Sequence, residues 1–147
     1  MVYEWKKGSH IKVNAQIAGE MCEKLNEEGQ LNAKTLVDMN RAEDAPLHDA
    51  FEWNDGVAAE KYRESQATHI INCLITKHDG SSEPTRTFFK LERTDTSYEH
   101  IDIILRNEDM TLQLLNQAMT ELKWFRKKYG SLKQLSKLFD AIDELTA

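Results

Sequence analysis

The sequence of 147 residues lacks several features, and each absence excludes a class of protein. It contains no apolar run of about 18 residues, so we expect no transmembrane helix. Its N-terminus has no apolar stretch behind a charged one, so we expect no signal peptide. Six glycines and two prolines are too few for a collagen-like or low-complexity chain. Two cysteines, Cys22 and Cys73, form no disulfide framework, and we predict buried free thiols in a reducing compartment.

Catalytic and metal-binding motifs are missing as well. The sequence has no P-loop, dinucleotide-binding glycine motif, G-x-S-x-G or H-E-x-x-H. The five histidines are scattered and make no short-spaced pair with another His or Cys. We therefore predict no enzyme, no metal site and no cofactor. The alternative is an acid–base cluster of His48, Asp49 and Glu52, although these residues also suit a capped turn before a helix.

Apolar periodicity predicts a single α+β domain over residues 1–147, mostly helical, with four or five helices and a small antiparallel β-hairpin. Helices are expected at about 9–28, 32–40, from 54 to between 70 and 77, 107–129, and 131–145. Ser9, Asn32, Asn107 and Ser131 are candidate N-caps, and Gly29 and Gly130 are candidate helix ends.

The predicted hairpin is formed by residues of about 71–77 and 85–91, joined across Asp79-Gly80. A further short strand is expected near Tyr98, and Tyr3 and Trp5 lie in an N-terminal strand or docked arm. The helix 107–129 is expected to be the central packing element, so that Leu122→Ala would cost about 2–5 kcal/mol.

The net charge of −6 argues against a general nucleic-acid coat, but the charge is unevenly distributed. Residues 20–64 contain twelve acidic and five basic residues. Residues 123–137 contain no acidic residue and form a candidate phosphate-facing patch. The patch consists of Lys123, Arg126, Lys127, Lys128, Lys133 and Lys137. Its cations also suit a helix C-terminus, and pairing with the acidic stretch inside the fold is the alternative.

Aromatic residues next to arginine suggest a second surface. On the third predicted helix, Ala59, Tyr62, Gln66, Ile70 and Cys73 are expected to share one side. Exposed aromatic residues beside Arg mark binding hot spots. We therefore take the residues Trp53, Tyr62 and Arg63 as a candidate binding surface, with burial in the core or at its rim as the alternative.

The segment from Ala45 to Ile71, APLHDAFEWNDGVAAEKYRESQATHII, resembles small proteins encoded by tailed phages and prophages of Gram-positive bacteria. The P-L-H, F-E-W and A-A-E-K-Y-R pieces carry the similarity. Tyr3-Glu4-Trp5-Lys6 and the segment W-F-R-K-K-Y-G at 124–130 extend it along most of the chain. The resemblance implies a phage or mobile-element origin and a setting in the cytoplasm of the host cell. It implies no activity and no site residue.

These observations favour a non-enzymatic, phage-encoded binding protein that occupies a host or phage macromolecule. An inhibitor of a bacterial defence system is one form of this function, because an acidic face can compete with nucleic acid for a basic groove. The alternative is a nucleic-acid-binding or DNA-transaction accessory protein that uses the patch at 123–137. A host or phage protein is the expected partner, nucleic acid is a further one, no membrane is expected, and the oligomeric state is open.

Overall fold

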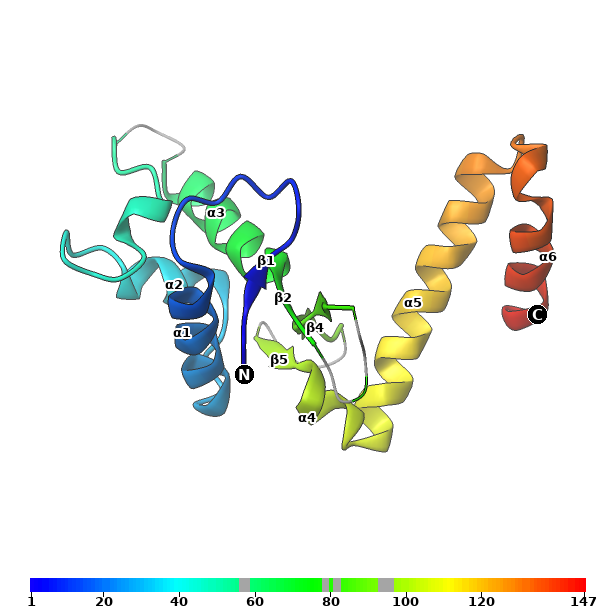
Figure 1. Ribbon diagram of the computed structural model, residues 1–147, viewed down its shortest axis with the longest axis horizontal. Coiled ribbons are helices and arrows are strands. Elements are labelled where there is room, and N and C mark those ends of the chain that lie inside the picture. The colour runs from blue at the N-terminus through cyan, green and yellow to red at the C-terminus, as the bar shows by residue number, and fades with distance from the viewer. Residues whose placement is uncertain (56–58, 78–79, 81–82, 93–96) are drawn as a thin grey trace. The chain divides into compact units, whose positions relative to one another are not determined.

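The computed structural model describes the chain except for residues 56–58, 78–79, 81–82 and 93–96 (Figure 1). Its contacts divide the chain into two compact units, Met1–Ile103 and Ile104–Ala147, and each is described by itself. The predicted class is confirmed, since helices dominate and the strands are short and antiparallel. The described residues form six α-helices, one of them a short turn. The prediction of a single domain over 1–147 stays a prediction.

The elements follow one another as β1 (Glu4–Trp5), α1 (Ala15–Glu27), α2 (Ala33–Met39), η1 (His48–Ala50), α3 (Ala59–Cys73), β2 (Leu74–Thr76), β3 (Thr85–Arg86), β4 (Phe88–Lys90), β5 (Tyr98–His100), α4 (Ile101–Leu105), α5 (Glu108–Tyr129), η2 (Lys133–Leu135) and α6 (Ser136–Leu145). The labels η1 and η2 denote short 3-10 turns.

Local capping chemistry sets most helix ends. The Asn32 side chain accepts a hydrogen bond from Thr35 N at 2.9 Å, as predicted for an N-cap. Gly29, which follows α1, has a φ of +69°. Glycine adopts this left-handed conformation without steric cost because it has no Cβ. The cap predicted at Ser9 is wrong, because Asn14 caps α1 by accepting a hydrogen bond from Ile17 N at 3.0 Å.

The predicted hairpin is present, but its second strand divides between two sheets. β2 lies between β1 and β3, and Ile75 is paired with both Glu4 and Arg86. β4 pairs instead with β5, in the register Phe88↔His100. Thr87 is the branch point, because its N–H donates to Leu74 O and its carbonyl accepts from Ile101 N. The short strand expected near Tyr98 is therefore confirmed.

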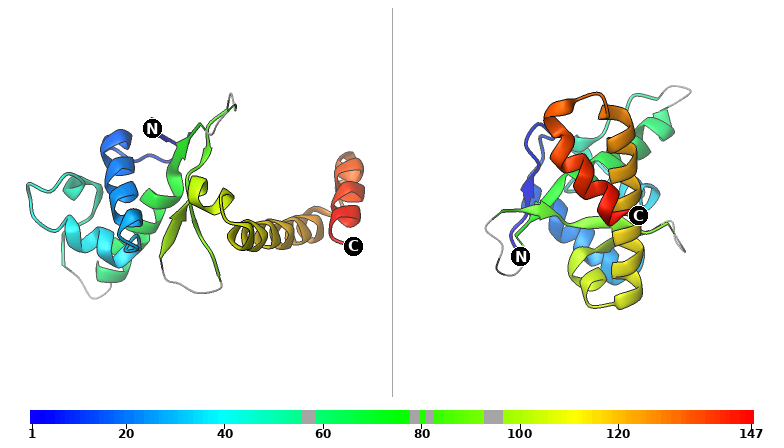
Figure 2. Two further views of the ribbon diagram at one scale, coloured as in Figure 1. Left: turned by 90° about the horizontal axis from the view of Figure 1, so that it is seen from below. Right: turned by 90° about the vertical axis from the view of Figure 1, so that its right-hand side faces the viewer.

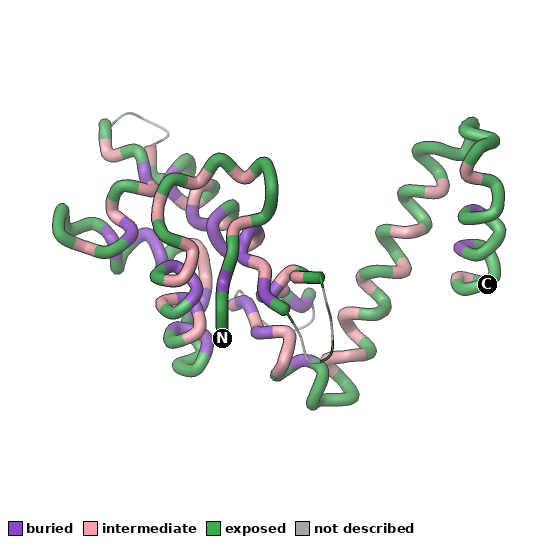
Figure 3. The backbone as a smooth tube through the Cα atoms, in the orientation of Figure 1, coloured by how far each residue is buried: buried purple, intermediate pink, exposed green. Residues whose placement is uncertain are grey.

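The core of unit 1 consists of apolar side chains from the helices, strands and loops between Tyr3 and Tyr98 (Figure 3). On α3 the inner face differs from the predicted one: Arg63, Ala67, Ile70 and Ile71 are buried, whereas Tyr62 is exposed. The helix is thus rotated by about one residue, because β-branched and small side chains pack against the core while the polar end of Tyr62 reaches water. Cys73 is buried, as predicted for both thiols, and Ile70 on the same helix is buried as well.

Unit 2 consists of α5 and α6, with α6 folding back beside the C-terminal part of α5 (Figures 1 and 2). The N-cap at Asn107 is confirmed by its bond from Met110 N at 3.0 Å. The cap at Ser131 is wrong, since α6 begins after the turn η2 without a side-chain cap.

The expectation that α5 is the central packing element is also wrong. All of its residues are described and none is buried. Leu122 is half-buried, so we expect its replacement by Ala to cost less than the 2–5 kcal/mol of a buried leucine. In the pair formed by α5 and α6, the buried side chains lie on α6, where Phe139 and Ile142 face α5.

Candidate binding surfaces

Arg63 and Trp53 meet in the structure, but Arg63 is buried there. The Arg63 guanidinium lies 5.1 Å from the centre of the Trp53 ring, and the Arg63 residue is 6% exposed. Its nitrogens donate to Glu52 O at 3.2 Å, to Asp55 at 3.3 Å and to Glu60 at 3.2 Å. Arg63 therefore fastens the segment before α3 to the helix, an internal role that leaves its guanidinium little surface for a partner.

His48 makes two further contacts with Trp53. The Trp53 ring stacks on His48, with 4.8 Å between ring centres and 3° between planes, and its Nε1 donates to His48 O at 2.7 Å. The ring is half-buried, so only part of it faces solvent. Of the three residues in the predicted surface, Tyr62 is the exposed one, at 51%. That these residues bind a partner stays a prediction.

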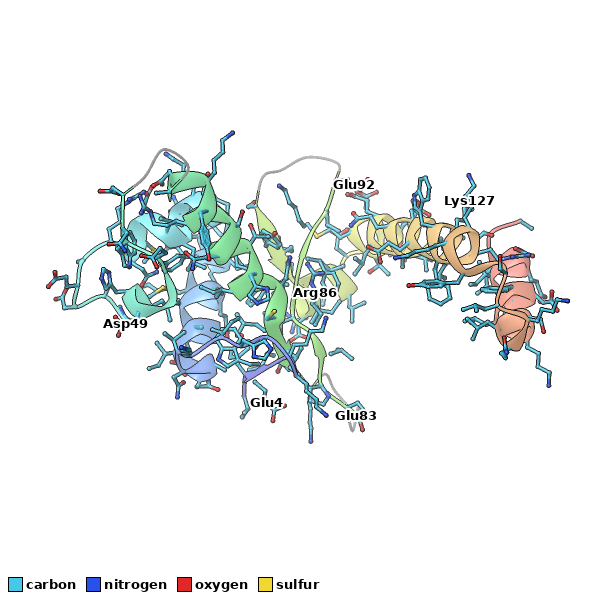
Figure 4. The ribbon with its side chains drawn as sticks, turned by 90° about the horizontal axis from the view of Figure 1, so that it is seen from above. Glu4, Asp49, Glu83, Arg86, Glu92 and Lys127 are labelled. Carbon is cyan, nitrogen blue, oxygen red and sulfur yellow. The ribbon has the colours of Figure 1, made fainter. Side chains whose placement is uncertain are left out.

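Tyr62 lines an open hollow of about 390 Å³ on unit 1. Ser9, Lys12, Asp49 and His69 contribute polar groups to its wall, with Asp49 on the η1 turn (Figure 4). Residues 9–12 line this hollow, and the longer segment 6–12 contains three lysines and no acidic residue. This second basic segment was not predicted from the sequence, because it holds only three basic residues against six in the run at 123–137.

The basic patch predicted at 123–137 lies entirely in unit 2, on α5, η2 and α6. Lys127 projects from α5 (Figure 4), and its Nζ lies 5.4 Å from the centre of the Trp124 ring. The Nζ of Lys128 lies 5.2 Å from the Tyr129 ring in the same way. Trp124 is 65% exposed. Cations over exposed aromatic rings form a surface suited to stacking and to phosphates.

Ion pairs engage residues of both charged segments. In the patch, Arg126 pairs with Asp143 at 3.1 Å and also covers the Phe139 ring. In the acidic stretch, Arg41 bonds Asp38 and Glu60, and hydrogen bonds from Arg41 and then Arg63 hold the pKa of Glu60 below its usual value. Unit 1 keeps 19 acidic and 12 basic residues, a net charge of −7, whereas unit 2 has a net charge of +1.

The acid–base alternative at His48, Asp49 and Glu52 receives no support from the geometry. The Nδ1 of His48 lies 3.0 Å from Asn40 O, while Glu52 accepts from Asn54 N. Asp49 is exposed on the wall of the hollow. Over the ranges that the structure describes, no group of three or more His, Cys, Asp or Glu is placed to hold a metal ion.

Both cysteines are free and buried, as predicted. Burial raises the pKa of the Cys22 thiol to about 12 and also raises the pKa of Cys73. The Cys73 sulfur lies 3.5 Å from His69 Nδ1, and His69 Nε2 lies 2.9 Å from Ser9 O. Because the thiolate is the reactive form of cysteine, the raised pKa values disfavour the reactive form of both side chains.

In comparisons with protein-family models, curated proteins and solved structures, none matches this chain. The resemblance to phage and prophage proteins therefore stays a prediction. Within the described residues, every helix is too short or too polar to cross a bilayer.

Proposed function

We propose that the protein is a non-enzymatic, phage-encoded binding protein that occupies a host or phage macromolecule through the acidic surface of unit 1. The observation that carries the proposal is the net charge of −7 on this unit. A surface of this sign attracts a basic groove and speeds the encounter with it. A host protein that binds nucleic acid, such as a component of a defence system, has such a groove.

The outer face of α1 carries three glutamates of this surface, together with Lys24. Glu20, Glu23 and Glu27 follow one another at helical spacing and line a shallow hollow of about 360 Å³. Glu23 is held in place by the Tyr3 hydroxyl, which donates to it at 2.6 Å. Glu20 accepts from Gln16 Nε2 at 3.0 Å. Carboxylates fixed in this way present a preorganised row of negative charge to a partner.

The test is a pull-down from a Gram-positive host lysate with three baits. The wild-type chain is compared with Glu20→Lys/Glu27→Lys, and the control is Asp140→Lys/Glu144→Lys, which changes the net charge equally but on α6. We expect wild type and control to retain the same nucleic-acid-binding protein, eluted by salt and displaced by DNA. The α1 variant should lose it. Equal recovery with all three baits would contradict the proposal.

A second candidate is nucleic-acid binding by the patch at 123–137. The specific observation in its favour is the exposed Trp124 ring beside Lys127, because stacking and charge together bind single strands. It predicts a gel shift of a single-stranded oligonucleotide that weakens steeply with salt. Trp124→Ala should weaken the shift, and Trp53→Ala should not, since that ring is engaged with His48 and Arg63. No shift at low salt would exclude this candidate.

A further inference from the structure

Unit 2 is too small to bury its own apolar side chains. Within residues 104–147 only Ile104, Phe139 and Ile142 are buried apolar residues, and all of this unit is described. Units of this length seldom have a sufficient core without a metal, disulfides or a partner chain. Its cysteine content is zero, so disulfides do not supply the missing stability.

One face of α5 carries the apolar side chains that remain uncovered. Leu112 and Leu115 are 55% and 52% exposed, and Met119 and Leu122 continue the same face at spacings of three and four residues. α6 has ten residues against 22 in α5, or about 15 Å against about 33 Å, so it covers at most half of this face. Its contacts involve the C-terminal part of α5, at Phe125 and Arg126.

The pattern on this face is self-complementary. The stripe formed by Leu112, Leu115, Met119 and Leu122 is centred on position 117 of α5. An antiparallel copy with the same centre places Leu112 opposite Leu122 and Leu115 opposite Met119. The two Leu115–Met119 pairs then lie beside the two-fold axis. Each apolar residue thus meets an apolar residue of the copy, as an isologous interface requires.

The charges along α5 select the same orientation. Its first turn carries Glu108 and Asp109, and its last turn carries Arg126, Lys127 and Lys128. In an antiparallel pair the acidic turn of one copy lies beside the basic turn of the other, and the helix dipoles also oppose. A parallel pair would bring like charges together at both ends. Trp124 follows Leu115 by nine residues and so lies on the opposite side of the helix, outside the interface.

We propose that this face of α5 binds the same face of α5 in a second copy of the chain. The two helices run antiparallel, and the α6 helix of each copy covers one end of the pair, which makes a four-helix arrangement. Leu138 and Leu145, which are exposed on α6, give it a second apolar edge for the neighbouring copy. The proposal concerns unit 2 alone and does not rest on the acidic surface of unit 1.

The first test is the mass of the full-length protein in solution, by light scattering on a sizing column. We expect twice the 17.0 kDa of one chain. Leu115→Glu should give a monomer with unchanged circular dichroism, because this exposed side chain contributes little to the monomer fold. Trp124→Glu is the matched control, an exposed apolar residue made acidic on the opposite side, and should remain a dimer. A wild-type monomer at high concentration, or a dimer that Leu115→Glu leaves intact, would overturn the proposal.

The second test determines the relative orientation of the two α5 helices, which non-specific hydrophobic association would not fix. Copies carrying Leu112→Cys are mixed with copies carrying Leu122→Cys under mild oxidation. We expect the mixed disulfide-linked dimer to form several-fold more than either like pair, since the native cysteines are buried. A preference for like pairs would show a parallel dimer, and no preference would show that the face covers something else, such as unit 1 or another protein. Either result contradicts the antiparallel dimer.

Discussion

Arg63 joins the segment before α3 to the helix itself, and its environment explains how a cation can be buried in this protein. Its acidic partners keep contact with water, since the Asp55 side chain is 90% exposed. The guanidinium donates hydrogen bonds to one backbone carbonyl and two carboxylates, and it makes a cation–π contact with one aromatic ring. A buried charge with several partners of this kind avoids most of its desolvation cost.

Replacing Arg63 by Met should therefore lower the free energy of unfolding by about 2–3 kcal/mol. Hydrogen bonds to charged groups and a cation–π contact are lost, while the two carboxylates remain hydrated. Urea denaturation measures this change. Tyr62→Ala, at the exposed neighbouring position, serves as control and should shift stability by no more than about 0.5 kcal/mol. Equal losses for both variants would show that Arg63 is not the fastening residue.

At Gly19 the backbone of α1 lies close to the Tyr3 ring. A Cβ at this position would overlap the ring of Tyr3, which packs across the helix. Gly19→Ala should destabilise the protein by about 1–3 kcal/mol, although alanine favours a helix by about 1 kcal/mol. In a Tyr3→Ala background the same substitution should become stabilising, because the overlap is gone. Chemical denaturation of the four proteins of this cycle tests the change of sign.

The buried thiol of Cys22 predicts a loss of stability at alkaline pH. Because its pKa is raised from 9 to about 12, the folded state keeps the proton that the unfolded state releases above pH 9. The stability present below pH 9 is lost as the pH rises toward 12, by about 1 kcal/mol per pH unit. Denaturation of wild type and Cys22→Ala at pH 8 and pH 10 measures the difference. A wild-type slope no steeper than that of the variant would contradict this role.

At the scale of elements, Asn26 connects α1 to β5. Its Nδ2 donates to Tyr98 O at 3.1 Å and to Glu99 Oε1 at 2.7 Å, and its Oδ1 accepts from His100 N at 2.9 Å. The side chain thus takes the place of a neighbouring strand along one edge of β5. Phe88 and Tyr98, on the two paired strands, are held over the core by this arrangement.

Asn26→Ala should cost about 1–3 kcal/mol, because it leaves a buried N–H and a buried carbonyl without their partner. Hydrogen exchange of the His100 amide should accelerate more than that of amides in α2. Lys24→Ala, on the exposed side of the same helix, is the control and should change neither quantity. Unaltered exchange at His100 in Asn26→Ala would show that β5 is held by its pairing with β4 alone.

At the scale of the whole molecule, the division into two units predicts separate stability. All members of the main core cluster lie between Tyr3 and Tyr98, within unit 1. A chain ending at Ile103 should therefore unfold cooperatively, with a core of its own. Residues 104–147 alone should be helical only at concentrations where they associate. Thermal melts followed by circular dichroism test both fragments, and a non-cooperative melt of 1–103 would show that the core needs unit 2.

The proposals for function also belong to this scale. The net charge of −6 conceals an acidic unit and a nearly neutral one with basic and aromatic residues at its helix junction. The Trp124 surface and the α5 stripe occupy different sides of one helix. A dimer through α5 would therefore leave the Trp124 surface available, in two copies.

The sequence by itself determined what depends on neighbours in the chain. Asn32 and Asn107 cap their helices because the bond they accept comes from three residues ahead. The buried thiols and the helical class followed from composition and periodicity in the same way.

Only the tertiary structure decided which side of each element is inside. Arg63 is buried because its partners come from the segment before α3, a pairing that no helical stripe contains. The strand at 85–91 divides at Thr87 because β5 offers Phe88 a second partner. The apolar residues of α5 are spaced like those of a helix that packs on a core, yet this face stays uncovered along half its length. Periodicity shows that a face is apolar, but it does not show what covers that face.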